Sequence, residues 1–379
     1  MLRRQLIAAT ASAAIPFLGS RAFAANAGVG DREIVIGQSA VLSGPLGGAM
    51  NGFNAGAQLA FDSTNSQGGV HQRQIRYISL DDELKPDKTV INYKKLLGEH
   101  QAFALFGCVG SANVSAGLSI LAESNAPMIG NYGLGDSARQ KAAGAAYFVR
   151  AGYGREADRL VQHLTSIGMT RISVAHLAVP GGVEVLNSIR AAIKAQNASW
   201  DVIRSAGVKP DGSDAVAAGK ALAEGGAQAI IMFLAGPPVA ELIKSVQATG
   251  ASPVFYGISS VAGEQVAKAM GPRLRGLAIA QVVPYPWSDA DATSREFRKL
   301  SAAKSVPVSY YTYEGYINGL VLIEALRRTG RALTRDNLHA TMRALKTRIA
   351  GMDLDFTSGP TGSRLVDLVH VTSDGRFVR

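Results

Sequence analysis

Cysteine is nearly absent from this 379-residue sequence, in which Cys108 is the only one. A single cysteine cannot form an internal disulfide, so the folded chain must depend on its hydrophobic core for stability. The six histidines are scattered, and neither an HxxxH nor a CxxC spacing occurs, which argues against a zinc site. We therefore expect no metal and no disulfide, and we interpret Cys108, which follows a buried strand, as a small structural residue.

The usual signatures of catalysis are also missing. There is no GxSxG nucleophile elbow, no phosphate-binding GxxxxGK[ST] sequence, and no set of acid, base and nucleophile at a recognisable spacing. The glycines between Gly107 and Ser111 lie at a strand-to-helix turn, but their spacing does not fit the dinucleotide fingerprint GxGxxG. These absences predict a protein that is not an enzyme and needs no cofactor.

Positive charge exceeds negative charge without being concentrated anywhere. The formal net charge is +10, yet the sequence contains no run of Lys and Arg and no aromatic stacking motif. Nucleic-acid binding is therefore not indicated. The excess supports at most a mild attraction for anionic solutes.

The N-terminus has the three parts of a cleavable signal peptide. Arg3 and Arg4 precede the apolar stretch 6–18, and the segment ends at Ala24. Thirteen residues are too few to cross a membrane as a helix, which takes about 20. We expect residues 1–24 to be removed and the protein to be exported to the periplasm, by either the general or the twin-arginine route. Removal of three arginines would lower the net charge to 10 − 3 = +7.

The remaining chain reads as short β-branched runs that alternate with Ala-rich amphipathic segments. This pattern predicts an α/β fold with mostly parallel sheets, and about 355 residues favour two domains over one. The predicted strands are 34–37, 75–80, 103–107, 128–129, 172–175, 229–234, 254–257 and 277–283. The predicted helices are 51–64, 87–97, 111–124, 156–167, 183–195, 214–223 and 239–249.

Beyond residue 284 the pattern becomes mostly helical, with predicted helices 294–303, 311–328 and 334–345. We expect these helices to return to the first lobe, and residues 352–379 to pair into the second. Lobe one would then comprise 25–148 plus 285–349, and lobe two 149–284 plus 350–379. Three crossings, near 147–154, 284–287 and 349–356, would form a hinge between two Rossmann-like lobes.

Two turns at strand ends are candidate ligand-binding positions, because solutes of open α/β sheets lie at the carboxyl ends of strands. Ser111 begins the predicted helix 111–124, where its hydroxyl can bind a carboxylate or simply cap the helix. The loop Asn131-Tyr132-Gly133 follows the next strand, and its backbone can approach a solute closely. Tyr132 supplies an aromatic wall or simple packing.

Several short segments, in this order and spacing, give the sequence a family resemblance: 42–45, 56–62, 81–82, 106–107, 126–129 and 313–316. Over residues 33–379 the chain resembles the type I periplasmic binding proteins, specifically the branched-chain amino acid binding family of ABC importers. The resemblance implies two lobes that close around a solute and a partnership with membrane permease subunits. It also implies that Ser111 and the loop at Tyr132 bind a ligand carboxylate in lobe one, and we expect a monomer.

The sequence departs from the family where an amino-acid ligand would need partners for its ammonium group. The family's loop hydroxyl and second-lobe acid correspond to Leu134 and Ser259, and its second-lobe tyrosine corresponds to Gly181. Glu314 and Asp136 are candidate substitutes, or residues of local structure. We therefore keep three alternatives: an amino acid, an aromatic or aliphatic acid without an amine, and a sensor subunit with the same fold. The residues expected to close from lobe two are Tyr153, Gly181, Ala235 and Ser259.

Overall fold

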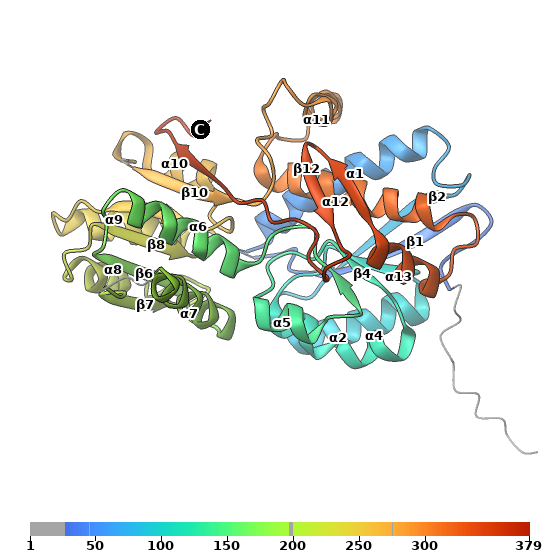
Figure 1. Ribbon diagram of the computed structural model, residues 1–379, viewed down its shortest axis with the longest axis horizontal. Coiled ribbons are helices and arrows are strands. Elements are labelled where there is room, and N and C mark those ends of the chain that lie inside the picture. Colours follow the sequence, from blue (N-terminus) through green and yellow to red (C-terminus); the bar gives the residue numbers. More distant parts are fainter. Residues whose placement is uncertain (1–26, 45, 197–199, 275) are drawn as a thin grey trace, which may run out of the picture.

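The computed structural model describes residues 27–44, 46–196, 200–274 and 276–379, so the expected signal peptide lies outside the described residues. Two α/β lobes lie side by side along the longest axis of the molecule (Figure 1). The predicted fold class, an α/β protein with mostly parallel sheets in two lobes, is confirmed.

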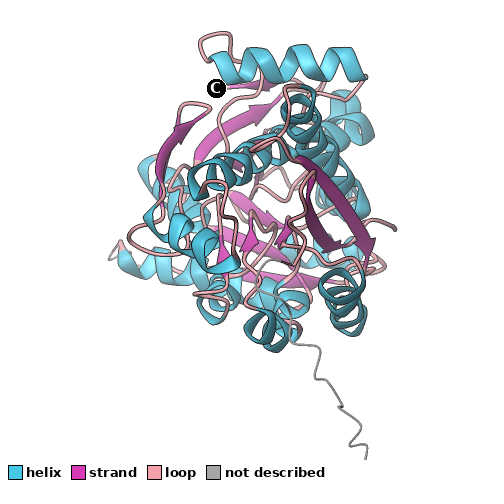
Figure 2. Cartoon of the chain, turned by 90° about the vertical axis from the view of Figure 1, so that its right-hand side faces the viewer, coloured by secondary structure: helices cyan, strands magenta, loops and turns pink. Residues whose placement is uncertain are grey.

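Lobe one is built on a five-stranded parallel sheet with the order β2-β1-β3-β4-β5. The strands are β1 (Glu33–Ala40), β2 (Gln74–Asp81), β3 (Ala104–Phe106), β4 (Met128–Ile129) and β5 (Ala146–Tyr147). Ile34 and Ile36 of β1 belong to one buried cluster and Val35 to another, because successive side chains of a strand face opposite sides. Helices therefore cover both faces of this sheet (Figure 2), which explains why its inner strand β3 reads as the apolar run Ala-Leu-Phe.

The helices of lobe one come from two separate parts of the chain. The first part contributes α1 (Gly47–Ser66), α2 (Pro86–Lys94), the π-helix η1 (Lys95–Glu99), α3 (Ser111–Ala116), α4 (Leu118–Ser124) and α5 (Asp136–Lys141). The second contributes α11 (Ala292–Lys304), α12 (Tyr310–Thr329) and α13 (Arg335–Ala344). Helices α1 and α12 pack directly on each other, and a Cβ at Gly56 or Gly315 would lie less than 2 Å from a carbonyl oxygen of the other helix. Glycine at these positions permits the close crossing.

Lobe two is built on a seven-stranded sheet with the order β14-β13-β10-β9-β8-β6-β7. The strands are β6 (Ile172–Leu177), β7 (Arg204–Val208), β8 (Ala229–Phe233), β9 (Val254–Gly257), β10 (Leu277–Gln281), β13 (Asp367–Val371) and β14 (Phe377–Val378). Only the last two pair in antiparallel fashion. The helices are α6 (Tyr153–Ser166), α7 (Pro180–Ala195), α8 (Ala215–Ala223), α9 (Pro238–Ala248), α10 (Gly263–Met270) and the 3-10 turn η2 (Gly271–Arg273).

The chain passes between the lobes three times, but the third crossing lies later than predicted. Strand β11 (Lys346–Ile349) pairs with β12 (Met352–Asp355) in a hairpin beside α12, so residues 352–355 do not join the sheet of lobe two. The crossing instead runs through 356–366, where the N–H of Gly362 donates to the carbonyl of Phe148 at 2.8 Å. The first and third crossings are therefore hydrogen-bonded neighbours.

Candidate functional site

A cavity of about 270 Å³ lies between the two lobes. Its walls come from residues at or just after the ends of β1, β2, β3 and β4 in lobe one and of β6, β8 and β9 in lobe two. The start of α1 closes one side. The cavity thus occupies the carboxyl ends of both sheets, which is where open α/β sheets bind solutes.

Ser111 is the first residue of α3 and lies in the cavity wall. It does not cap its own helix; its Oγ accepts a hydrogen bond of 2.9 Å from the backbone N–H of Gly135, in the next loop. Because this bond occupies a lone pair and leaves the hydroxyl hydrogen free, Ser111 can donate that hydrogen to a solute in the cavity.

Helix α7 of lobe two begins directly opposite Ser111. A Cβ at Gly181, in the first turn of α7, would lie 3.6 Å from Ser111 Oγ. The N-cap residue of α7 is Val179, and no side chain caps the helix. The positive end of a 16-residue helix therefore faces the cavity, where it favours an anion.

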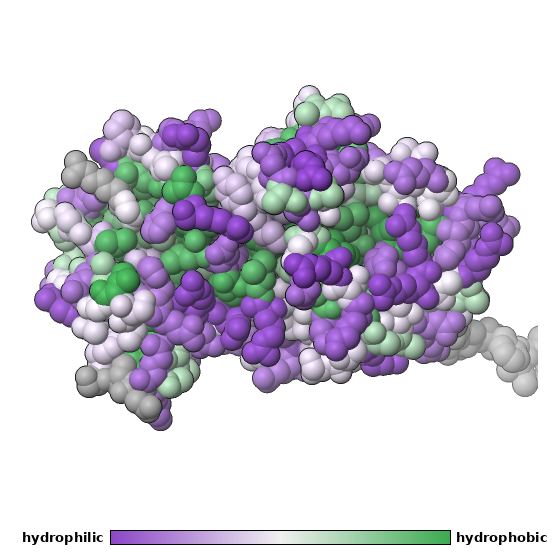
Figure 3. All heavy atoms as spheres, turned by 45° about the horizontal axis from the view of Figure 1, so that its top comes forward, coloured by the Kyte–Doolittle hydropathy of each residue, from purple (hydrophilic) through white to green (hydrophobic). Residues whose placement is uncertain are grey.

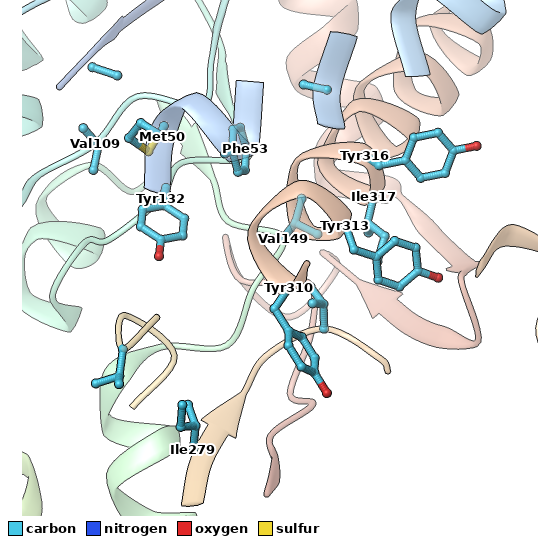
Figure 4. Close-up of a cluster of buried hydrophobic side chains, with 14 of the residues drawn as sticks. Met50, Phe53, Val109, Tyr132, Val149, Ile279, Tyr310, Tyr313, Tyr316 and Ile317 are labelled. Atoms are coloured by element: carbon cyan, nitrogen blue, oxygen red, sulfur yellow. The ribbon is translucent and has the colours of Figure 1, made fainter. Parts of the chain in front are cut away.

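Two tyrosines form one wall of the cavity. Tyr132 packs against Phe53, with ring centroids 6.1 Å apart, and Figure 4 shows it beside Met50 and Val109 with its hydroxyl directed away from them. Tyr153, at the start of α6, packs against Phe233 at 5.0 Å. Burial raises the pKa of Tyr153 to about 12 and that of Tyr132 well above its ordinary value, so both hydroxyls stay protonated. The hydroxyl of Tyr132 is itself buried without a partner among the described residues, which leaves that of Tyr153 as the donor to the cavity.

The rest of the wall is apolar, with Leu46, Met50, Leu84, Val109, Leu177 and Phe233 among its members. Its other polar side chains are Asn113 and Ser260, and none of the described lining residues is an acid or a base. The amide nitrogen of Asn113 is already bonded to Thr89 Oγ1 at 2.7 Å. The cavity therefore offers hydroxyl donors to an anion but no carboxylate to an ammonium group.

Six of the eight predicted site residues line this cavity: Ser111, Tyr132, Gly133, Tyr153, Gly181 and Ala235. Asn131 does not, because successive residues of the extended segment after β4 face opposite sides and Tyr132 takes the cavity side. The side-chain amide of Asn131 is buried and has no partner among the described residues. Ser259 is also outside the cavity, and Ser260 lies in the wall instead.

Ser259 belongs to a buried charged cluster at the hinge, behind the two tyrosines. Its backbone N–H and its hydroxyl donate to the carboxylate of Glu156 at 2.8 and 3.0 Å, and its Oγ also accepts from Arg150. Arg150 forms ion pairs with Glu156 and Glu314, both at 3.2 Å. These bonds hold Ser259 away from the cavity, so its predicted role as a cavity residue is wrong.

Burial sets the electrostatics of this hinge cluster. It raises the pKa of both Glu156 and Glu314, while the Arg150 guanidinium acts in the opposite direction. Burial by itself lowers the pKa of Arg150, but the carboxylates of Glu314 and Glu156 raise it above its ordinary value. Sequence reasoning missed Arg150, although an arginine inside a predicted crossing is a signal that could have found it.

The lobes touch each other around the cavity. Ser137 of α5 donates from its N–H and its hydroxyl to the carboxylate of Glu184 in α7, at 2.6 and 2.7 Å. The hydroxyl of Tyr311 in α12 donates to the carbonyl of Ser260 at 2.9 Å. The structure therefore describes the cleft in a closed arrangement. On the face shown in Figure 3, hydrophobic side chains are visible chiefly in hollows between hydrophilic ones.

The periplasmic binding protein sequence profile matches residues 33–376. The chain belongs to this family. The match covers both lobes and all three crossings, which confirms the family resemblance found in the sequence. No curated protein gives a significant match to this periplasmic binding protein.

Solved structures with the same architecture include a substrate-binding periplasmic protein from Ralstonia solanacearum, at 30% identity and a TM-score of 0.83, covering 91% of this chain and 99% of that one. A branched-chain amino acid ABC transporter protein from Thermus thermophilus with bound valine has 15% identity and a TM-score of 0.80, covering 92% and 96%. A solute-binding protein of an R. palustris ABC transporter in complex with benzoate has 18% identity and a TM-score of 0.78, covering 91% and 95%. At such identities the last two show the fold alone.

Two further findings concern the described residues. None of their helices combines the length and apolar character that a membrane span requires. Their His, Cys, Asp and Glu side chains form no group of three or more positioned to hold a metal ion.

Proposed function

We propose that this periplasmic binding protein is the substrate-binding component of an ABC importer, and that it takes up a small apolar carboxylic acid that lacks an amine. In this proposal the signal peptide directs the protein to the periplasm and the protein acts as a monomer. It performs no catalysis, and it delivers its solute to membrane permease subunits. Family membership supports the transport role, and the cavity supports the class of solute.

The carboxylate is expected between Ser111 and the start of α7. Ser111 has a free hydroxyl hydrogen on the lobe-one side, and α7 offers the backbone N–H of Gly181 on the lobe-two side, because the N–H groups of Gly182 and Val183 already donate to the carbonyl of Val179. One anion placed there contacts both lobes at once. Such a solute favours the closed form, because only closure brings both sets of donors within reach.

The absence of an acid from the described cavity wall is the observation that carries the choice of solute. An ammonium group buried in this wall would have no carboxylate partner, and leaving a charge buried and unpaired costs several kcal/mol. The volume of about 270 Å³ equals that of about nine water molecules, which suits a solute of roughly nine to twelve non-hydrogen atoms. Valine and benzoate in the cited structures show that this fold holds solutes of both classes.

Matched pairs of solutes test the proposal. Isocaproate is leucine without its amino group, and hydrocinnamate is phenylalanine without it. We expect calorimetry and thermal shift to show binding of benzoate, isocaproate or hydrocinnamate. Leucine and phenylalanine should bind at least tenfold more weakly than their amine-free acids, because the cost of burying an unpaired ammonium group exceeds the 1.4 kcal/mol that corresponds to a factor of ten. Tighter binding of leucine or phenylalanine than of its amine-free acid would refute the choice of solute.

A further inference from the structure

The buried charged cluster at the hinge contacts the cavity wall but does not belong to it. Arg150 is 1% exposed, Glu156 is fully buried and Glu314 is 4% exposed. The cluster holds one positive and two negative groups, so each carboxylate depends on the same guanidinium. Nothing in the proposed binding of a solute uses these charges.

The partners of Arg150 come from different lobes. Glu314 lies near the start of α12 in lobe one, and its Oε1 is 3.2 Å from Arg150 Nη1. Glu156 lies in the first turn of α6 in lobe two, and its Oε1 is 3.2 Å from Arg150 Nη2. The side chain of Arg150 thus joins the two lobes through charged groups.

The backbone of Arg150 is attached to lobe one. Arg139 of α5 donates to the carbonyls of Arg150 and Ala151 at 3.0 and 3.1 Å. The chain enters lobe two immediately afterwards, at Gly152 and the start of α6. A rotation of the lobes about this crossing therefore moves the lobe-two groups Glu156 and Ser259 relative to the backbone of Arg150.

The same guanidinium packs on both tyrosines of the cavity. Its central carbon lies 4.8 Å from the ring centre of Tyr132 in lobe one and 5.8 Å from that of Tyr153 in lobe two. A cation placed over an aromatic ring is attracted to the face of that ring, and the attraction is strongest where water is excluded. Arg150 therefore fixes one cavity side chain from each lobe.

We propose that Arg150 is a positioning residue that couples closure of the cleft to the shape of the cavity. In the closed arrangement its guanidinium satisfies Glu314 of lobe one and Glu156 of lobe two, and it holds Tyr132 and Tyr153 against the solute. Opening removes Glu156 and Ser259 from the guanidinium and requires water to enter the hinge. This inference rests on the proposed binding of a solute in the cavity, but its effect on the lobes is measurable without any solute.

Arg150→Met tests the coupling, because methionine keeps much of the length and removes the charge. Arg335→Met is the matched control: Arg335 is also 1% exposed, but it donates to the carbonyls of Ala102, Phe103 and Ser124, all within lobe one. Both variants are expected to unfold at lower temperature than the wild type. Only Arg150→Met is expected to alter closure.

The distance between the lobes is measured by spin labels on cysteines placed at Glu123 of α4 and Lys194 of α7, both exposed. The native Cys108 is fully buried and does not compete for label. Without solute, Arg150→Met is expected to shift the distances towards longer values, while Arg335→Met matches the wild type. A tenfold fall in the closed fraction raises the apparent Kd about tenfold, which calorimetry with benzoate and isocaproate would show.

Arg150→Lys and Glu156→Gln complete the test and remain informative if Arg150→Met does not fold. Lysine restores one charged contact, so Arg150→Lys is expected to give distances and affinity between those of the wild type and Arg150→Met. Glu156→Gln keeps the shape of the side chain but removes its charge, and it is expected to lengthen the distances less than Arg150→Met does. The coupling would be overturned if Arg150→Met showed the same distances as the wild type. If Arg150→Met does not fold, wild-type distances in both Arg150→Lys and Glu156→Gln would overturn it. If the wild type binds no carboxylic acid, the proposed solute class is wrong, whereas the solute-free distances still decide the role of Arg150.

Discussion

Replacing Ser111 with alanine should weaken the binding of a carboxylic acid far more than it weakens the fold. Ser111 Oγ accepts one hydrogen bond, from the N–H of Gly135 at 2.9 Å, and its own hydrogen remains available to a solute. Alanine removes both interactions. Ser119→Ala is the control, because this serine is exposed on the neighbouring helix α4.

The two losses have different sizes. A neutral hydrogen bond such as that from Gly135 contributes about 1 kcal/mol to stability, whereas a hydrogen bond to a charged group contributes about 1.5 to 3 kcal/mol. The second range corresponds to a Kd that rises roughly 10- to 150-fold. We therefore expect a small fall in melting temperature and a large rise in the Kd for isocaproate.

Calorimetry of the wild type, Ser111→Ala and Ser119→Ala provides the measurement. The neutral amide of isocaproate should bind weakly to all three proteins and lose little on the Ser111→Ala change, because it carries no negative charge. A Kd for isocaproate within twofold of the wild-type value would show that Ser111 makes no contact with the solute. An equal loss for acid and amide would show that the serine shapes the cavity and does not bind the carboxylate.

Three further outcomes are expected. Gly181→Leu should fill the cavity and abolish the calorimetric signal with benzoate while leaving the melting temperature nearly unchanged, because a Cβ at Gly181 has open space around it apart from a contact at 3.6 Å. Gly315→Ala should lower the unfolding free energy by about 1 to 3 kcal/mol or more in urea titrations, because its Cβ would lie 1.8 Å from the carbonyl oxygen of Phe53; Gly98→Ala, where nothing lies within 4 Å, should not. Cys108 should react with an aromatic disulfide reagent at pH 8 only after unfolding, because it is fully buried and burial raises its pKa to about 12.

The elements that sequence reasoning found are those whose pattern is set by burial. Strand β8 is buried along its whole length and reads as the continuous apolar run Ala-Ile-Ile-Met-Phe, and the buried strand β1 contains the apolar run 34–36. Strand β7 was missed because it lies at the edge of its sheet, contains Gly207 and exposes most of its residues, so its sequence lacks such a run. The predicted helix 111–124 is two helices that meet at Gly117, where a Cβ would lie 2.3 Å from the ring of Tyr93.

The error at the third crossing has a local cause. The hairpin of β11 and β12 turns through Ala350 and Gly351, both with positive φ. Such a two-residue turn is usually signalled by Asn-Gly or Asp-Gly, so Ala-Gly gave no hint of a hairpin. For the cavity, strand ends led to Ser111, Tyr132 and Gly181, and all three line it, because topology fixes where strands end. The apolar wall and the role of Ser259 depend on side-chain packing between lobes, which no local pattern encodes.

The placement of the hinge charges explains why they cannot serve an amino acid. Glu314 was a candidate partner for a ligand ammonium, but it is paired with Arg150 at 3.2 Å and is not among the residues of the cavity wall. Asp136, the other candidate, accepts the N–H of Gly154 at 2.8 Å, also outside the wall. The rings of Tyr132 and Tyr153 pack between the guanidinium and the cavity, so the solute meets aromatic carbon where an acid would be needed. An amino-acid binder would therefore require a new acid in the cavity wall, such as that introduced by Ala235→Glu, because Glu314 and Asp136 are held by other partners.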